Sequence, residues 1–434
     1  MATTYDAIII GAGVIGGCLG FELAKCGYKT LNVDKLGAAG HGSTGASCAI
    51  IRVHYSTYDG VAIANEGVWY WKNWAEHLGA DDEAGLATYH NVGCVVTKNP
   101  RNDNLVNVLA NLNRLGIAHE EWSAEDLVRH VPVVDPRNFW PVRRRDDPAF
   151  GVPTGERVAG AVFTPDAGYV GDPQLSAHNA ESAARAAGGQ FRFNAEVAAI
   201  RQAGGRVSGI TLKDGERIDA PVVVNVAGPH SHAINRMAGV TDGMRVTTKA
   251  LRVEVAHVPA PAGFDFENLG CVFSDGDIGC YFRPEKGNHI LVGSEDPECD
   301  PREWVDPDDF DRSFSDQWTN QVYRLGQRIP GIGIPNTAAG LVDCYDVSDD
   351  WIPIYDRSDL DGYYMAIGTS GNQFKNAPVV GALMAELIER CENGHDHDRD
   401  PIQFPLVHTG ETVDLGFCSR LREINEASSF SVIG

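Results

Sequence analysis

The sequence predicts an α/β fold in which a Rossmann-like dinucleotide-binding domain is interleaved with a second domain built on an antiparallel sheet. A glycine fingerprint directly follows an apolar run close to the N-terminus, within residues 5–34. A second strand–glycine–helix pattern at residues 221–231 returns the chain to the same domain. From residue 244 onward, short apolar runs repeat as in an antiparallel sheet. At 434 residues, the chain is also too long for one ordinary core.

The fingerprint assigns a physical task to each residue type. The apolar run 7–10 is short enough for a buried strand, and Gly11, Gly13 and Gly16 follow it. Gly11 permits the tight turn, Gly13 lets the backbone approach a pyrophosphate, and Gly16 lets the next helix pack on the strand. The free N–H groups at that helix start favour phosphate charge. Asp34 stands 21 residues after Gly13 and can bind a ribose hydroxyl. The fingerprint alone does not separate NAD from FAD.

Periodicity and turn residues predict further elements along the chain. Ser123 followed by Asp126 is typical of a helix start. A Gly/Ser turn at 368–378 follows a strand and opens a helix that reaches Ile388. The other expected elements are helices at 61–78, 102–115, 173–188 and 317–328, a strand at 221–226, and a meander of strands at 191–193, 197–202 and 209–212.

Composition excludes several classes of function. The net charge of −23 argues against nucleic acid and against an anionic membrane surface as partners, although it leaves an anionic substrate open. No apolar run reaches the length of a membrane span. The first strand begins within a few residues of the start, which leaves no room for a signal peptide. The ten cysteines form no CxxC pair, so we expect free thiols in a cytoplasmic protein.

Three charged stretches allow competing interpretations. Arg52 directly follows an apolar run and is either structural or aimed into a pocket. The arginines at 143–145 meet the acids at 146–147, which is typical of a solvated loop. Residues 395–398, His-Asp-His-Asp, could ligate a metal, but they follow a helix end among other charges. We therefore expect a solvated linker there, and no metal site in the protein.

Five ordered segments together carry a resemblance to a known family. They are the fingerprint with Asp34, the GSTGAS stretch at 42–47 with its continuation to Tyr55, the GDP at 171–173, the VNVAGP at 224–229, and the GTSGNQFKNAP at 368–378. In these segments the chain resembles the FAD-dependent D-amino-acid oxidase superfamily. Within it, the chain is most similar to the sarcosine oxidase and dimethylglycine dehydrogenase branch. The resemblance covers roughly residues 5–390 and implies a glutathione-reductase-type FAD-binding domain.

The resemblance implies one FAD per chain. The residues that it places around FAD are Gly11, Gly13, Val14, Ile15, Gly16, Asp34, Lys35, Gly42, Ser43, Thr44, Ser47, Val197, Ala227, Gly228, Gly371, Asn372, Gln373, Phe374 and Lys375. The last five would bring a helix N-terminus to the flavin pyrimidine ring and stabilise charge on the reduced flavin.

The resemblance also implies a carboxylate site. Arg52 and Lys375 fall where sarcosine oxidases bind the substrate carboxylate. An arginine suits this role because its planar guanidinium can grip a carboxylate with two hydrogen bonds. Further candidates are Tyr55, Tyr281 and Tyr345 for an aromatic wall, with a core role equally open for each, and His54 and His289 as bases.

Three departures from the family pattern bear on the chemistry. Asp343 stands where monomeric sarcosine oxidases carry a flavin-linking cysteine, and Cys344 comes one residue later. Residues 44–46, Thr-Gly-Ala, stand where the other branch carries a linking histidine. We therefore expect non-covalent FAD. The oxygen-activating lysine of the oxidases has no secure match, and Arg283 is the nearest cation, so oxidase and dehydrogenase both stay open.

The implied activity is oxidation of the C–N bond of a small secondary or tertiary amino acid, such as an N-methyl or N-carboxyalkyl glycine. Hydride would pass to flavin N5, the imine would hydrolyse, and O2 or another acceptor would take the electrons. One alternative is a D-amino-acid or cyclic imino-acid dehydrogenase. Another is the flavin subunit of a hetero-oligomeric amine oxidase. A homo-oligomer is equally compatible with the sequence.

The expected division of the chain alternates between the two domains. The FAD-binding domain takes residues 1–85, 161–243 and 346–394, the substrate domain takes 86–160 and 244–345, and residues 395–434 form a C-terminal extension.

Overall fold

The strand before the fingerprint, β1 (Ala7–Ile10), lies inside a six-stranded sheet in the computed structural model, which describes residues 4–433. All of its residues are buried. Ile9 pairs in parallel with Asn32 on one side and Val224 on the other. The order of the strands is β20 (Ile354–Arg357), β21 (Tyr363–Ile367), β13 (Val222–Asn225), β1, β2 (Thr30–Val33) and β9 (Gln190–Arg192), and only β20 is antiparallel to its neighbour.

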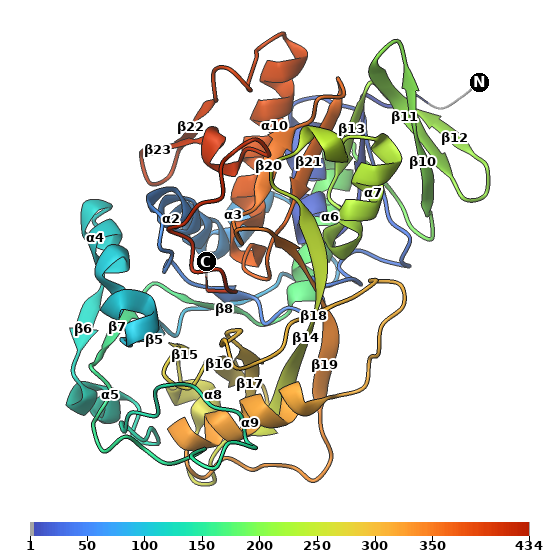
Figure 1. The fold of residues 1–434 in the computed structure, drawn as a ribbon. Coiled ribbons are helices and arrows are strands. Elements are labelled where there is room, and N and C mark those ends of the chain that lie inside the picture. Colours follow the sequence, from blue (N-terminus) through green and yellow to red (C-terminus); the bar gives the residue numbers. More distant parts are fainter. Residues whose placement is uncertain (1–3, 434) are drawn as a thin grey trace.

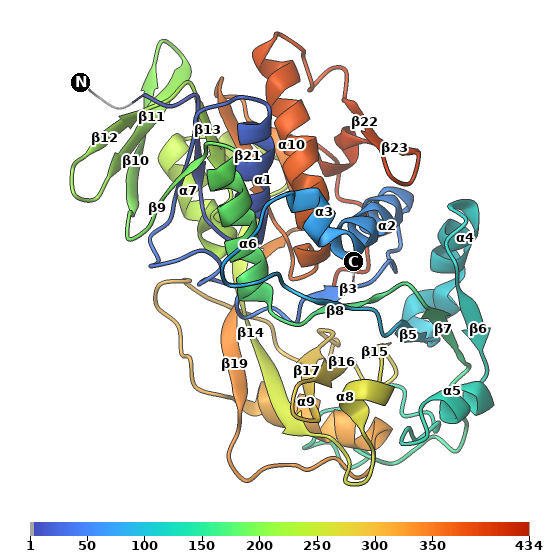
Figure 2. The same cartoon turned by 180° about the vertical axis from the view of Figure 1, so that it is seen from behind.

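Two layers cover this sheet, because successive residues of β1 face opposite sides. Ala7 and Ile9 belong to the core shared with the helices, whereas Ile8 and Ile10 belong to the core on the other face. Figure 2 shows the three helices of the first layer together: α1 (Val14–Lys25), α6 (Pro173–Ala186) and α10 (Ala377–Glu392). The second layer contains α7 (Ser231–Ala238) and the strands β10 (Val197–Ala203), β11 (Arg206–Leu212) and β12 (Arg217–Asp219).

The predicted meander is wrong in one strand. Residues 191–193 were expected in it, but β9 pairs in parallel with β2 at the edge of the main sheet. The reason is the preceding helix α6, which acts as a crossover and returns the chain to this edge. The prediction of the second buried strand is confirmed by β13, which pairs with β1.

The lower lobe in Figure 1 is built on a nine-stranded, mostly antiparallel sheet. Its strands are β5 (Cys94–Thr97), β6 (Glu120–Trp122), β7 (Ala161–Thr164), β14 (Thr248–Pro259), β15 (Val272–Asp275), β16 (Cys280–Glu285), β17 (His289–Ser294), β18 (Glu303–Trp304) and β19 (Gly340–Ser348). β7 pairs with β5 and β6 in this sheet, so the lower lobe, in which the substrate domain was expected, extends past the boundary at residue 160.

The remaining elements flank the two lobes. The helix start at Ser123 is confirmed, because its Oγ accepts from Asp126 N at 3.1 Å. The helix expected at 61–78 is divided at Asn73. The elements are α2 (Tyr58–Lys72), α3 (Trp74–Leu78), α4 (Val106–Arg114), α5 (Ala124–His130), α8 (Phe266–Leu269), α9 (Asp316–Arg328), the small sheet of β3 (Ile50–Ile51), β4 (Tyr89–His90) and β8 (Gly168–Val170), and the hairpin of β22 (Gln403–Leu406) and β23 (Glu411–Asp414).

Within residues 4–433, none of these helices combines the length and the apolar character needed to cross a lipid bilayer.

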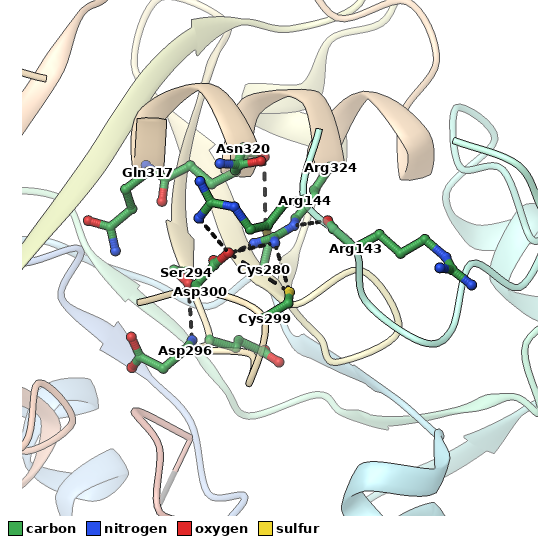
Figure 3. Close-up of polar contacts among 12 residues, drawn as sticks. Arg143, Arg144, Cys280, Ser294, Asp296, Cys299, Asp300, Gln317, Asn320 and Arg324 are labelled. Atoms are coloured by element: carbon green, nitrogen blue, oxygen red, sulfur yellow. Dashed lines mark hydrogen bonds and ion pairs between the residues drawn. The ribbon is translucent and has the colours of Figure 1, made fainter. Parts of the chain in front are cut away.

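An arginine of α9 ties two loops of the lower lobe together (Figure 3). Arg324 is buried, and its guanidinium forms a two-bond ion pair with Asp300 at 2.6 and 2.8 Å. Its Nε donates to the carbonyl of Arg143 at 2.9 Å. Arg144 lies 3.7 Å from the same Asp300 carboxylate. The arginine stretch is therefore only partly the solvated, self-compensating loop that its sequence predicts, because it also anchors the acidic segment that follows β17.

The C-terminal stretch packs back onto the upper lobe. The expectation of a solvated linker at 395–398 is wrong for its second half, since His397 is 1% exposed and Asp398 forms an ion pair with Arg420. His397 Nδ1 accepts from Ile402 N at 3.1 Å. These residues orient the β22–β23 hairpin, and the chain then turns back so that its C-terminal end lies between the two lobes in both views (Figures 1 and 2).

Candidate active site

A cavity of about 530 Å³ runs from the carboxyl ends of β1 and β2 to the junction of the two lobes. The fingerprint residues form its middle, and the residues after β2 form one end. The turn that precedes α10 and residues of the lower sheet form the other end. Ligands of open α/β sheets bind at the carboxyl ends of the strands, so the position of the cavity matches the expected cofactor site.

The middle of the cavity is a cradle that fits a pyrophosphate. Gly11 has φ +123°, and a Cβ there would lie 2.3 Å from the carbonyl oxygen of Val226. A Cβ on Gly13 would lie 3.0 Å from Thr44 Oγ1, which accepts from Val14 N at 3.1 Å. The first turn of α1 carries no acid that would repel a phosphate. The turn therefore needs glycine at Gly11 and has little room for a side chain at Gly13, and the helix that it opens presents its positive dipole end to the cavity.

The carboxylate of Asp34 lies at the end of the cavity where the sequence predicts the adenosine ribose. Its Oδ2 accepts from Ala12 N and its Oδ1 from Leu36 N, both at 2.8 Å. Each carboxylate oxygen keeps a further lone pair for a ribose hydroxyl. Lys35 Nζ lies 2.8 Å from His230 Nε2 and forms an ion pair with Asp308, a residue of the lower lobe. These contacts place residues of three distant segments around one end of the cofactor site.

Apart from Gly16, every residue that the family resemblance places around FAD lies in the cavity wall. Gly16 lies behind the wall, where a Cβ would be 2.3 Å from the Gly11 carbonyl oxygen. Its role is the close packing of α1 on β1. The individual contacts to FAD stay predictions, but the wall is continuous from Asp34 to the turn before α10.

Lys375 lies in that turn and is 2% exposed. Its Nζ donates to Tyr55 Oη at 2.9 Å and to the carbonyl of Asn372. The Tyr55 hydroxyl in turn donates to the same carbonyl at 2.7 Å. Burial, with a smaller effect of Arg52, lowers the pKa of Lys375 well below its usual range, whereas burial raises the pKa of Tyr55 to about 12. Lys375 thus lies in the wall with a readily lost proton, and Tyr55 supports it from behind.

Arg52 lies in the same wall and is 7% exposed. Its Nη2 donates to the carbonyl of Val432 at 2.9 Å, and its Nη1 donates to the carbonyl of His54. Among the described residues, no carboxylate lies within ion-pair distance of this guanidinium. Both hydrogen bonds of this guanidinium go to carbonyl oxygens, and its Cζ lies 5.1 Å from the centre of the Tyr55 ring. Such partners compensate a buried positive charge only in part, so the guanidinium attracts an anion.

Two tyrosines face each other in the wall. Tyr281 Oη lies 3.0 Å from Tyr345 Oη and 3.9 Å from the thiol of Cys48. Glycines make room for both rings, since a Cβ on Gly293 would lie 2.3 Å from Tyr281 and one on Gly371 would lie 2.5 Å from Tyr345. Burial raises the pKa of both phenols, so both keep their protons. The pair offers an aromatic surface and hydrogen bonds, not a base.

Four of the sequence-based candidates lie away from the wall, and one of them is Tyr55, which was expected in an aromatic wall but lies behind it. Arg283 donates to the carbonyl of Cys48 at 2.7 Å, pairs with Glu285 at 2.8 Å and stacks over Tyr169. His54 is buried, neither of its ring nitrogens has a hydrogen-bond partner within residues 4–433, and burial lowers its pKa to about 3. His289 lies at the far end of β17 beside His257. The structure gives Arg283, His54 and His289 packing contacts instead of access to the cavity.

Sequence reasoning missed a buried acid behind the wall. Glu295 is fully buried, and its Oε1 accepts from Ser274 Oγ, a wall residue, at 2.5 Å. Its Oε2 has no hydrogen-bond partner in the described part of the chain. Burial raises the pKa of Glu295 to about 7. The sequence gives no signal for this contact, because Glu295 directly follows β17 and its partner Ser274 lies 21 positions earlier.

Replacement of this acid by a neutral isostere should change how stability depends on pH. The pKa of Glu295 is raised in the folded state, so its ionisation does not lower stability well below pH 4.5 and lowers it by up to about 3 kcal/mol above pH 7. We expect Glu295→Gln to match the native protein in apparent Tm near pH 5 and to exceed it near pH 8. Glu125→Gln, at an exposed glutamate, serves as the control. A Tm difference that stays constant between pH 5 and pH 8 would contradict the assignment.

Known proteins resemble this chain over most of its length. The family model of FAD-dependent oxidoreductases, the DAO family, matches residues 6–387. The glycine oxidase of Geobacillus kaustophilus is 27% identical over 413 residues, which cover 91% of this chain and 96% of that protein. The peroxisomal sarcosine oxidase of Mus musculus is 24% identical over 408 residues, which cover 90% of this chain and 94% of that protein.

Solved structures show the same fold. The crystal structure of L-proline dehydrogenase from P. horikoshii has a TM-score of 0.74 at 20% identity, covering 90% of this chain and 95% of that chain. The expected fold class, an FAD-binding Rossmann-like domain interleaved with an antiparallel-sheet domain, is confirmed, and so is FAD as the cofactor. The chain belongs to the DAO family of FAD-dependent oxidoreductases.

Proposed function

We propose that this protein oxidises the C–N bond of a small amino acid with a secondary or tertiary amine, which it holds by the carboxylate. The observation that carries the proposal is the buried Arg52 guanidinium, which lies in the cavity wall without an acidic partner among the described residues. A substrate carboxylate would supply the missing charge through two parallel hydrogen bonds. The relatives support an amino acid as substrate, since glycine oxidase and sarcosine oxidase are named for amino acids, and the amine of sarcosine is a secondary one.

The wall residues divide the remaining work. FAD, when bound, supplies the acceptor for the two electrons that leave the substrate. A carboxylate that enters the site would raise the pKa of Lys375, because a nearby negative charge stabilises the protonated form of a buried amine. Tyr281 and Tyr345 present a surface against which a small N-substituent can pack. Together these groups orient and desolvate the amine, which is the main contribution that a protein makes to such a reaction.

A panel of amines tests this proposal. The yellow protein is mixed without oxygen with N-substituted glycines, glycine, D-amino acids and cyclic imino acids, and flavin absorbance is followed. We expect the N-substituted glycines to bleach the flavin band fastest. Faster bleaching by D-amino acids or cyclic imino acids would shift the assignment to the corresponding dehydrogenase. No bleaching by any of them would refute amine oxidation by the isolated chain, and would leave a partner-dependent flavin subunit.

Arg52→Ala should weaken substrate binding without loss of FAD. Hydrogen bonds to a charged group contribute about 1.5–3 kcal/mol, so KM should rise about 10- to 100-fold. Arg52→Lys keeps the charge but loses the two-bond geometry, so we expect an intermediate KM. Loss of the yellow colour in Arg52→Ala would mean that the residue is structural.

FAD should leave the protein on acid precipitation. The thiol nearest the position of the family's linking cysteine is Cys344, which is buried in the cavity wall. Burial and the neighbouring Asp343 raise its pKa to about 12, so it carries little of the thiolate that attacks a flavin. A yellow pellet after trichloroacetic acid would contradict this expectation, and Cys344→Ser would then show whether this thiol is the link.

A further inference from the structure

The C-terminal stretch has a fixed root. Arg420 is 2% exposed and forms a two-bond ion pair with Asp398 at 2.7 and 2.9 Å. Arg422 forms another with Asp350, at 2.9 and 2.7 Å. Asp350 lies between β19 and β20, and Asp398 lies between α10 and β22. Buried ion pairs with this geometry are costly to break, so residues 419–425 are held firmly.

The tip of the stretch, residues 428–433, is held differently. Val432 packs with Leu251 and Val253 of β14 and with Trp351, which lies between β19 and β20. Within the described chain, two hydrogen bonds connect the tip to other segments: Arg302 Nη2 donates to the carbonyl of Phe430 at 2.6 Å, and Arg52 Nη2 donates to that of Val432 at 2.9 Å. The remaining hydrogen bonds of the tip run among residues 425–433 themselves. Both outside donors are arginines, and Arg302 is exposed.

The tip also forms part of the substrate end of the cavity. Val432 and Ile433 both lie in its wall, beside Arg52 and Tyr345. The Val432 carbonyl uses the Nη2 of Arg52 that a two-bond carboxylate grip would need. A carboxylate and this carbonyl therefore compete for one guanidinium.

We propose that the tip 428–433 is a specificity element that covers Arg52 in the free enzyme and yields its contact at Val432 to a substrate carboxylate. The inference rests on the proposed function, because it assumes that Arg52 binds that carboxylate. A full negative charge binds a buried guanidinium better than a carbonyl dipole does, so a carboxylate can displace the tip. A neutral amine without a carboxylate offers no such exchange and leaves the tip in place. The tip would thus select substrates that carry a carboxylate over amines that lack one.

The test uses acetate, a carboxylate that cannot be oxidised at a C–N bond, with the intact yellow protein. Acetate binding is followed by the change in flavin absorbance, and the tip by amide hydrogen exchange of the peptide that contains 428–433. We expect acetate to speed exchange in this peptide. Arg302→Ala removes one of the two outside hydrogen bonds of the tip, so it should bind acetate about three- to tenfold more tightly with FAD retained.

Two further variants separate the outcomes. Arg129→Ala, at an exposed arginine of α5 with a single ion pair, should leave both readouts unchanged. Arg52→Ala should abolish acetate binding. If acetate binding depends on Arg52 but exchange of the tip stays constant or slows, the tip proposal is overturned while the carboxylate site stands. Weaker or equal acetate binding in Arg302→Ala overturns it as well. Acetate binding that survives in Arg52→Ala, or is absent from the native protein, overturns the carboxylate site too.

Discussion

The burial of the Arg52 charge is the constraint around which the substrate end is organised. A guanidinium removed from water must be stabilised by partners, and here these are carbonyl oxygens of His54 and Val432. One partner is local, and the other lies 380 residues further along the chain. The hydrogen bond from Arg52 to Val432 therefore helps to hold the C-terminal stretch at the junction of the lobes. The guanidinium is thus held in place by neutral oxygen atoms that compensate its charge only in part.

The acidic segment after β17 connects this end of the cavity to the other. It begins with Glu295 behind the wall, continues to Arg302 under the C-terminal tip, and reaches Lys35 through Asp308. Its own position depends on the Arg324–Asp300 ion pair shown in Figure 3. A segment of the lower lobe thus touches the substrate wall, the tip and the adenosine end.

The sequence predicted best what is encoded in contiguous motifs. The strand, turn and helix of the fingerprint, the return strand β13 and the turn before α10 are each specified by neighbouring residues. It failed where the decisive partner is distant. Nothing around Val432 or Asp308 signals a contact with Arg52 or Lys35, and β9 reads as a meander strand until the crossover through α6 is known. Arg283 illustrates the converse, because a cation near the right position in sequence was given packing contacts by the fold.

The protonation of the residues in and directly behind the wall limits what the site can do to a substrate. Tyr55, Tyr281 and Tyr345 keep their protons because burial raises their pKa values, so none of them can remove a proton near neutral pH. Lys375 is the opposite case, since burial lowers its pKa and an entering anion raises it again. In the proposed function, carboxylate binding and proton uptake at Lys375 Nζ would therefore be linked. The entering carboxylate would then help to create the positive charge that binds it, and this would favour acids in addition to the shape of the site.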